Sequence, residues 1–371
     1  GTEGARAHGA PAPSLLALER DAAAFYAAPP RAKVRGRANL PSGESPLLPA
    51  SIGAPSSAEF PLLVRAQPAA ADAGVEACAR AVRALCDDEG ALLRHGAVLL
   101  RGLPLASPED FDAFCTAIGW TTSKLGGGGT ARTVLAKNVR TASDEPAEHT
   151  IEPHLDMAHN AAFPHRIAFF MLHGPPRGAG GETVLTDMRA VTTDMEAAGL
   201  AEEFARRGGV LYRKKLWSAD RVGHSFTWQR RFFSEDKAEV EAQLSQLPGV
   251  TWTWTEDDAL LFDNTLPANV QHPITGETLW FNGAHTNHRD YFDLAPHINT
   301  TDGSPFDTFF ADGTEIPAEK LAVIRASIWR NSRAAPLQSG DLCIVDNQLA
   351  AHGRMGWTPG VDRKMLLMHF A

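Results

Sequence analysis

Apolar residues in this chain recur in short segments with the periodicity of β-strands. Continuous apolar runs, as at 164–171, are typical of buried strands, and alternation, as at 251–254, is typical of half-buried ones. The predicted strands are 97–100, 133–136, 138–139, 164–171, 183–186, 210–212, 251–254, 277–282, 340–346 and 364–370. Many short strands with few helices between them favour a barrel or sandwich core.

Helical spacing of apolar residues appears in a smaller number of segments. Ser107 followed by Pro108 and two acids is a typical helix start, and Val75, Cys78, Val82 and Leu85 repeat at helical intervals. The predicted helices are 14–27, 75–93, 107–118, 187–206, 236–246 and 316–331. The chain is therefore predicted to be mainly β with a helical cover.

Composition divides the chain into two regions. Residues 1–57 are rich in Ala, Pro, Gly and Ser and read as an N-terminal extension, whereas 58–371 read as one domain. A polar and aromatic stretch around 213–250 is expected to be an insert that lies over the core like a lid.

Charge and cysteine content narrow the possible partners. The net charge of −9 argues against a nucleic-acid partner, and the absence of a long apolar run argues against a membrane span. The four cysteines lack CxxC spacing, which favours free buried thiols in a cytoplasmic protein. A homo-oligomer remains open.

The strongest chemical signal is His154-Leu155-Asp156. On an extended strand, residues i and i+2 face the same side, so His154 and Asp156 could hold one metal ion while Leu155 faces the core. Two imidazoles and one carboxylate form the facial triad of non-haem Fe(II) oxygenases. A third ligand would have to come from a neighbouring strand, and His352, after the apolar segment 340–346, is the candidate.

Further motifs occur in a recognisable order. Gly180-Gly181-Glu182-Thr183 follows the first histidine, the segment 273–282 lies between the two halves, and Arg363 lies 11 residues after His352. In this order the motifs resemble the taurine dioxygenase/clavaminate synthase-like family of Fe(II)- and 2-oxoglutarate-dependent oxygenases. The resemblance extends from about residue 99 to the C-terminus and implies a double-stranded β-helix (jelly-roll) fold.

The resemblance also implies roles for individual residues. His154, Asp156 and His352 would be the catalytic metal ligands, and Arg363 would bind the distal carboxylate of 2-oxoglutarate through its planar guanidinium. The remaining positions are Thr183 and Arg354 for cosubstrate support, and Asn138, Thr141 and Asn282 for the substrate pocket. Family members that bind a sulfonate carry a second arginine four residues after the anchor, but here that residue is Leu367.

The expected activity is hydroxylation of a small molecule, which is amino-acid-like or a natural-product intermediate. Fe(II) would be the cofactor, 2-oxoglutarate and O2 would be consumed, and succinate and CO2 would be released. Desaturation, epoxidation and cyclisation remain open, because they depend on substrate placement. Two alternatives of another class are a non-catalytic ligand-binding jelly-roll and a zinc hydrolase with the same three ligands. His285 and His288, three residues apart, are rival metal ligands.

Overall fold

The computed structural model describes residues 14–20, 60–123, 139–143, 145–221, 223–293 and 298–371. Its largest sheet has seven strands in the order β1-β2-β3-β15-β6-β17-β4. All neighbouring pairs are antiparallel except β2 and β3, which run parallel. The strands are β1 (Leu16–Leu18), β2 (Leu62–Ala66), β3 (Ala97–Arg101), β15 (Leu342–Asp346), β6 (Arg166–His173), β17 (Lys364–Phe370) and β4 (Arg140–Thr141).

A second sheet of four strands faces the first. Its order is β14-β7-β16-β5, and every pair is antiparallel. The strands are β14 (Ser332–Ala335), β7 (Thr183–Asp187), β16 (Ala350–Arg354) and β5 (Ile151–His154). One buried apolar cluster joins the two sheets, with Phe169 and Leu367 from the seven-stranded sheet and Leu185 and Ala350 from the four-stranded sheet. The core therefore lies between the sheets.

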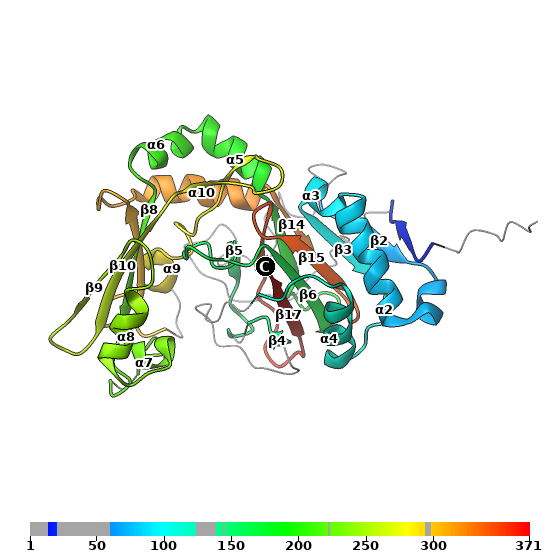
Figure 1. The fold of residues 1–371 in the computed structure, drawn as a ribbon, viewed down its shortest axis with the longest axis horizontal. Coiled ribbons are helices and arrows are strands. Elements are labelled where there is room, and N and C mark those ends of the chain that lie inside the picture. Colours follow the sequence, from blue (N-terminus) through cyan, green and yellow to red (C-terminus); the bar gives the residue numbers. More distant parts are fainter. Residues whose placement is uncertain (1–13, 21–59, 124–138, 144, 222, 294–297) are drawn as a thin grey trace, which may run out of the picture.

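Helices cover the outer face of the seven-stranded sheet (Figure 1). Alternate residues of β17 point to this side, and Leu366, Met368 and Phe370 pack there against helix residues such as Phe111 and Phe114. The covering elements are α2 (Ala69–Arg83), the π-helical turn η1 (Ala84–Asp88), α3 (Ala91–His95) and α4 (Pro108–Ala117).

A third sheet, β13-β8-β10-β9, lies on the other side of the molecule (Figure 1). Its strands are β13 (Phe306–Phe310), β8 (Val210–Leu216), β10 (Leu260–Leu266) and β9 (Val250–Trp254), and β11 (Asn269–Gln271) pairs separately with β12 (Thr278–Trp280). The helices of this half are α5 (Met188–Ala197), α6 (Leu200–Arg206), α7 (Trp228–Phe232), α8 (Lys237–Leu244), α9 (Arg289–Asp293) and α10 (Ala318–Arg330).

The predicted balance of strands and helices is confirmed: the protein is mostly β-sheet with helices outside. The helix expected at 14–27 is wrong at its start, because Leu16–Leu18 form β1 and pair with β2. Pairing at a sheet edge here outweighs the helical preference of an Ala- and Leu-rich segment. The strands β2, β10, β11, β13, β14 and β16 were not predicted. The four cysteines are free and buried.

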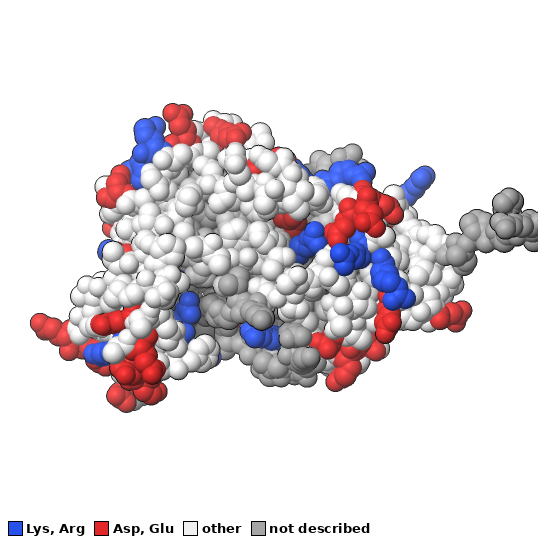
Figure 2. All heavy atoms as spheres, viewed as in Figure 1, with Lys and Arg blue, Asp and Glu red and all other residues white. Residues whose placement is uncertain are grey.

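In the face shown in Figure 2, acidic and basic side chains are intermixed, at the edges and in a cluster within the right half. Lysine and arginine form no continuous stripe over the described residues of this face. No helix among the described residues is long and apolar enough to cross a membrane.

Candidate active site

Two histidines are brought together by strand pairing. His352 on β16 lies directly opposite His154, the last residue of β5, and their ring centroids are 4.6 Å apart. Residues directly opposite each other in an antiparallel pair project to the same face of the sheet. Phe169 from the facing sheet packs 4.7 Å from the His352 ring, so the imidazoles lie between the two sheets.

Asp156 completes the group from a turn and not from a strand. The expected extended His-x-Asp segment is therefore wrong in one respect, because β5 ends at His154 and a turn begins at Asp156. Asn347 fixes that turn: its Oδ1 accepts from the Asp156 backbone N–H at 2.9 Å, and its Nδ2 donates to the Asp156 carbonyl at 2.9 Å. Leu155 is buried, as expected.

The three side chains fit a metal ion. One Asp156 oxygen, Oδ1, lies 3.4 Å from His154 Nε2 and 3.7 Å from His352 Nε2. The other oxygen, Oδ2, lies 2.7 Å from His369 Nε2, and His154 Nδ1 lies 3.0 Å from the Glu152 carbonyl. Within the described residues, these three form the set whose ligand atoms all lie within 4.8 Å of one another. The contacts of Asp156 Oδ2 and His154 Nδ1 leave Asp156 Oδ1 and His154 Nε2 to face a common centre with His352 Nε2.

A buried ionic network supports β5 from behind. Glu152 is fully buried, accepts from Arg325 Nε at 3.3 Å and from Trp329 Nε1 at 3.3 Å, and burial raises its pKa to about 7 despite Arg325. Arg325 also makes a bidentate pair with Asp290 at 2.9 and 2.8 Å. Sequence reasoning missed this network because its members are far apart in the chain.

The rival histidines have other partners. His285 Nε2 donates to the Pro153 carbonyl at 3.0 Å, and burial lowers the His285 pKa to about 3, so its ring is neutral. His288 lies 3.0 Å from Asp290 Oδ1 and 3.7 Å from Asp307 Oδ1. These contacts position α9 and β13 and do not bring both rings to one centre.

Arg363 lies just before β17 and reaches across to β7. Its Nε donates to the Gly181 carbonyl at 2.8 Å, and its Nη2 lies 3.4 Å from Thr183 Oγ1. Burial and then the charge of Arg354 lower the Arg363 pKa to about 9, against the opposing charge of Glu182. No carboxylate among the described residues forms an ion pair with Arg363. Gly181, at φ +78°, leaves room for this arginine, since a Cβ there would lie 2.9 Å from Arg363 Cδ.

Strand register relates this cationic group to the imidazoles. Thr183 is directly opposite Arg354, and Leu185 is opposite His352, so the two pairs are two residues apart on one face. Two residues of a strand span about 7 Å. That spacing suits a five-carbon dicarboxylate held at both ends. Arg354 also donates to the Pro146 and His149 carbonyls at 2.9 and 3.0 Å and so fixes the loop before β5.

The predicted substrate residues are only partly described. Asn138 lies outside the described residues. Thr141 is buried on β4 opposite Leu366. Asn282 is buried, but its amide is engaged locally, donating to Ala268 and accepting from the Ala284 N–H, both at 3.0 Å. Their contact with substrate stays a prediction.

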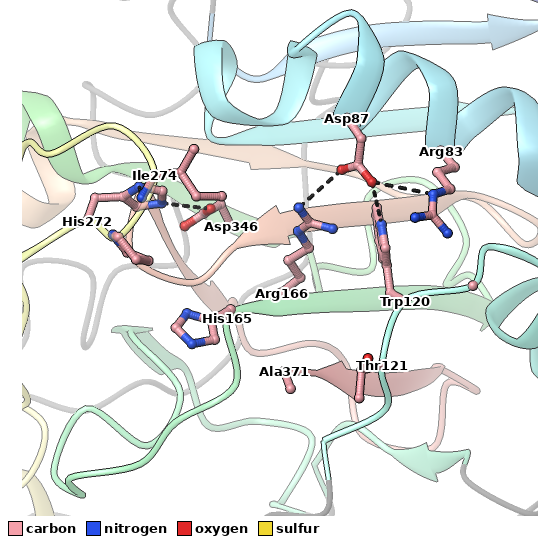
Figure 3. A pocket seen from close by; sticks show the side chains of 12 residues that line it. Arg83, Asp87, Trp120, Thr121, His165, Arg166, His272, Ile274, Asp346 and Ala371 are labelled. Carbon is pink, nitrogen blue, oxygen red and sulfur yellow. Dashed lines mark hydrogen bonds and ion pairs between the residues drawn. The ribbon is translucent and has the colours of Figure 1, made fainter.

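A surface pocket lies between η1, the end of β17 and the β11–β12 turn (Figure 3). It holds none of the three candidate ligands. Its Asp87 binds Trp120 Nε1 at 2.8 Å and lies 3.1 Å from Arg166, while His272 lies 3.1 Å from Asp346. Because these charged groups already pair with one another, we assign no ligand to this pocket.

Comparison with known proteins assigns the family. The model of the "Taurine catabolism dioxygenase TauD, TfdA family" matches residues 88–369. The chain belongs to this family. It is 28% identical to the dapdiamide synthesis protein DdaC of Enterobacter agglomerans over 71% of this chain and 79% of that one. It is also 28% identical to a clavaminate synthase-like protein of Arabidopsis thaliana, over 72% and 80%.

Among solved structures, PvcB of Pseudomonas aeruginosa is similar with a TM-score of 0.48 and 18% identity, over 84% of this chain and 86% of that chain. Family membership makes the protein an Fe(II)- and 2-oxoglutarate-dependent oxygenase, a non-haem iron dioxygenase. Iron and 2-oxoglutarate are accordingly its cofactor and cosubstrate.

Proposed function

We propose that His154, Asp156 and His352 bind the Fe(II) of this oxygenase, and that the enzyme hydroxylates a small molecule. The supporting observation is the cross-strand pair of imidazoles with one Asp156 oxygen 3.4 and 3.7 Å from their Nε2 atoms. Fe(II) with 2-oxoglutarate and O2 supplies the oxidising chemistry, which releases succinate and CO2. The chain's own task is to hold these groups in register.

Arg363 and Thr183 are proposed to bind the distal carboxylate of 2-oxoglutarate. The guanidinium is buried and has no carboxylate partner among the described residues, which is the state expected of a group that awaits an anion. Arg354 is proposed to support this end by adding positive charge and by fixing the 145–149 loop.

His369 and Asn347 are proposed to position Asp156. His369 engages Oδ2, which leaves Oδ1 as the single oxygen toward the metal, and Asn347 restrains the turn on both sides of the peptide. A ligand oriented in this way keeps the remaining metal positions free for cosubstrate and O2.

The two facing sheets are proposed to be the halves of a jelly-roll. One domain from residue 58 to the C-terminus, an N-terminal extension before it and an insert around 213–250 are proposed with them. The strand orders and the shared cluster between the sheets support this organisation. The insert region contains most of β8, with α7 and α8, and lies in the third sheet's half of the molecule.

Desaturation, epoxidation or cyclisation would use the same residues and differ only in substrate placement. A zinc hydrolase or a non-catalytic binding protein agrees less well with the structure, because the first would leave Arg363 and Thr183 without a role and the second would not need three convergent metal ligands.

Anaerobic titration tests the proposal. A visible charge-transfer band should appear only when Fe(II) and 2-oxoglutarate are both present. Asp156→Ala should remove the band and end succinate formation. Asp341→Ala is the control: the Asp341 carboxylate binds Arg101, so this variant should keep the band. Succinate formation by Asp156→Ala at the wild-type rate would refute the ligand assignment.

A further inference from the structure

The inner face of the third sheet carries one buried lysine. Residues of β8 alternate, and Val210, Tyr212, Lys214 and Leu216 form its buried side. Lys214 is 4% exposed and lies directly opposite aromatic residues on both neighbouring strands, Phe262 on β10 and Phe306 on β13. Its Nζ lies 5.2 Å from the Phe262 ring centroid. A buried ammonium is unfavourable unless it is paired.

The basic neighbours of Lys214 are paired, but Lys214 is not. Arg213 points to the other face and forms a bidentate pair with Asp263 at 2.9 and 2.7 Å. Lys215 Nζ donates to the Asp302 carbonyl at 3.0 Å. Within the described part of the chain, no ion pair or hydrogen bond reaches the Lys214 ammonium.

A second cation accompanies it. Arg231 belongs to α7, which packs on the sheet through Phe232 in a cluster with Phe262 and Leu216. Its guanidinium lies 5.4 Å from the Phe232 ring centroid, and no carboxylate among the described residues pairs with it. Phe262, which packs against Phe232 in that cluster, is the residue opposite Lys214, so α7 brings Arg231 to the Lys214 side of the sheet. Burial and then the charge of Arg231 lower the pKa of Lys214 to about 7.

The cations adjoin the metal centre through His159 and Asn264. His159 lies three residues after Asp156, and its carbonyl accepts from Asn264 Nδ2 at 3.0 Å. Asn264 is opposite Tyr212 and thus shares the face of Lys214, and its buried Oδ1 has no partner among the described residues. Burial, Lys214 and Arg231 hold the His159 pKa well below its usual range, and the charges of Asp156 and His154 also reach it.

We propose that Lys214 and Arg231 bind a carboxylate of the substrate, and that Asn264 Oδ1 accepts from an amide or amine N–H of the same molecule. The substrate class is then a small carboxylic acid with a nitrogen donor, such as an N-acylated amino acid. The sulfonate-binding arginine of related enzymes has no counterpart here, because Leu367 is 2% exposed within the core between the sheets. The anion is bound instead by the third sheet and the helix α7 that packs on it.

The proposal rests on the proposed function, and a binding experiment separates the two. Protein with Fe(II) and 2-oxoglutarate under anaerobic conditions, so that Arg363 is occupied, is titrated calorimetrically with N-acetylglycine, N-acetylglycinamide and inorganic phosphate. N-acetylglycine should bind at least tenfold more tightly than the amide or phosphate. Lys214→Met and Arg231→Met should each weaken N-acetylglycine binding at least tenfold, and Lys215→Met, on the opposite face of the same strand, should not change it.

The charge-transfer band is recorded before each titration. Its absence from the wild type would count against the proposed function. The calorimetric titration is carried out whether or not the band appears, so the carboxylate site is tested separately. Its presence in Lys214→Met shows that this variant folds and retains the metal centre. Equal binding of the acid and the amide, tighter binding of phosphate, no saturable binding of N-acetylglycine to the wild type, or unchanged binding by Lys214→Met would each overturn the carboxylate site.

Discussion

Lys214→Met is predicted to make the protein more stable. The lysine side chain is 4% exposed, lies between Phe262 and Phe306, and has a charged arginine near it. Methionine fills a similar volume without a charge to desolvate. A stabilising substitution at a buried position is unusual, since most buried substitutions destabilise.

The magnitude follows from the pKa of Lys214, which burial lowers from 10.5 to about 7. At about 1.4 kcal/mol for each pH unit between these values, the upper limit is about 5 kcal/mol at neutral pH. The contact with Phe262 favours the charged form and is lost in the variant, at about 1 kcal/mol. Relaxation around the ammonium reduces the remainder, so we expect a gain of about 2 kcal/mol.

The pH dependence has a definite sign. Between pH 7 and 10.5 the unfolded chain binds more protons at this lysine than the folded protein does, so wild-type stability rises with pH in that window. The advantage of Lys214→Met should therefore shrink toward zero near pH 10. Urea unfolding of metal-free protein at pH 7 and pH 9.5 measures this, with Lys215→Met as the control. A variant no more stable than wild type at pH 7, or an advantage as large at pH 9.5 as at pH 7, would contradict the reasoning.

Three further predictions concern other parts of the structure. Asn347→Leu should weaken Fe(II) binding about tenfold in an anaerobic titration, because Asp156 loses the hydrogen bonds that orient it. An unchanged Fe(II) affinity would contradict this role of Asn347. Arg363→Met should weaken 2-oxoglutarate binding about 100-fold, measured from the charge-transfer band, and leave Fe(II) affinity within twofold. Hydrogen bonds from Arg189 lower the pKa of Glu277 to about 2, so Glu277→Gln should lose about 1 kcal/mol at pH 7 after allowance for solvent screening. That difference should disappear as pH falls from 4.5 to 2, and its persistence in urea unfolding at pH 2.5 would refute it.

Much of the fold could be predicted because strands with strong apolar periodicity are specified locally. Two of the strands that escaped prediction lack this pattern: β16 is Ala350–Arg354 with a histidine, a glycine and an arginine, and β14 is Ser332–Ala335. Both are buried along their whole length, so the surrounding sheets determine their conformation. Tertiary pairing in this way explains why the strand that carries His352 cannot be seen in its own sequence.

The candidate site was predictable where spacing carries information. His154 and Asp156 are close in sequence, although a turn and not strand geometry brings the carboxylate to the imidazole. His369 could also have been found, because the odd-numbered residues of β17, Met365 and Leu367, face the space between the sheets and His369 continues that series. Arg325 carries no such signal, since its partner Glu152 is 173 residues away.

In the basic run 213–215, the alternation of side chains along a strand decides which of the three charges is buried. As a run of charges it is typical of a solvated face, and two of its members do have surface partners, Asp263 for Arg213 and the Asp302 carbonyl for Lys215. A strand turns every second residue to the other side, so the middle residue must face the interior. The charge of Lys214 is thereby placed where water cannot stabilise it, and no local carboxylate compensates. A fold that tolerates such an unfavourable group beside a reaction centre is most simply explained by a ligand that supplies the missing negative charge.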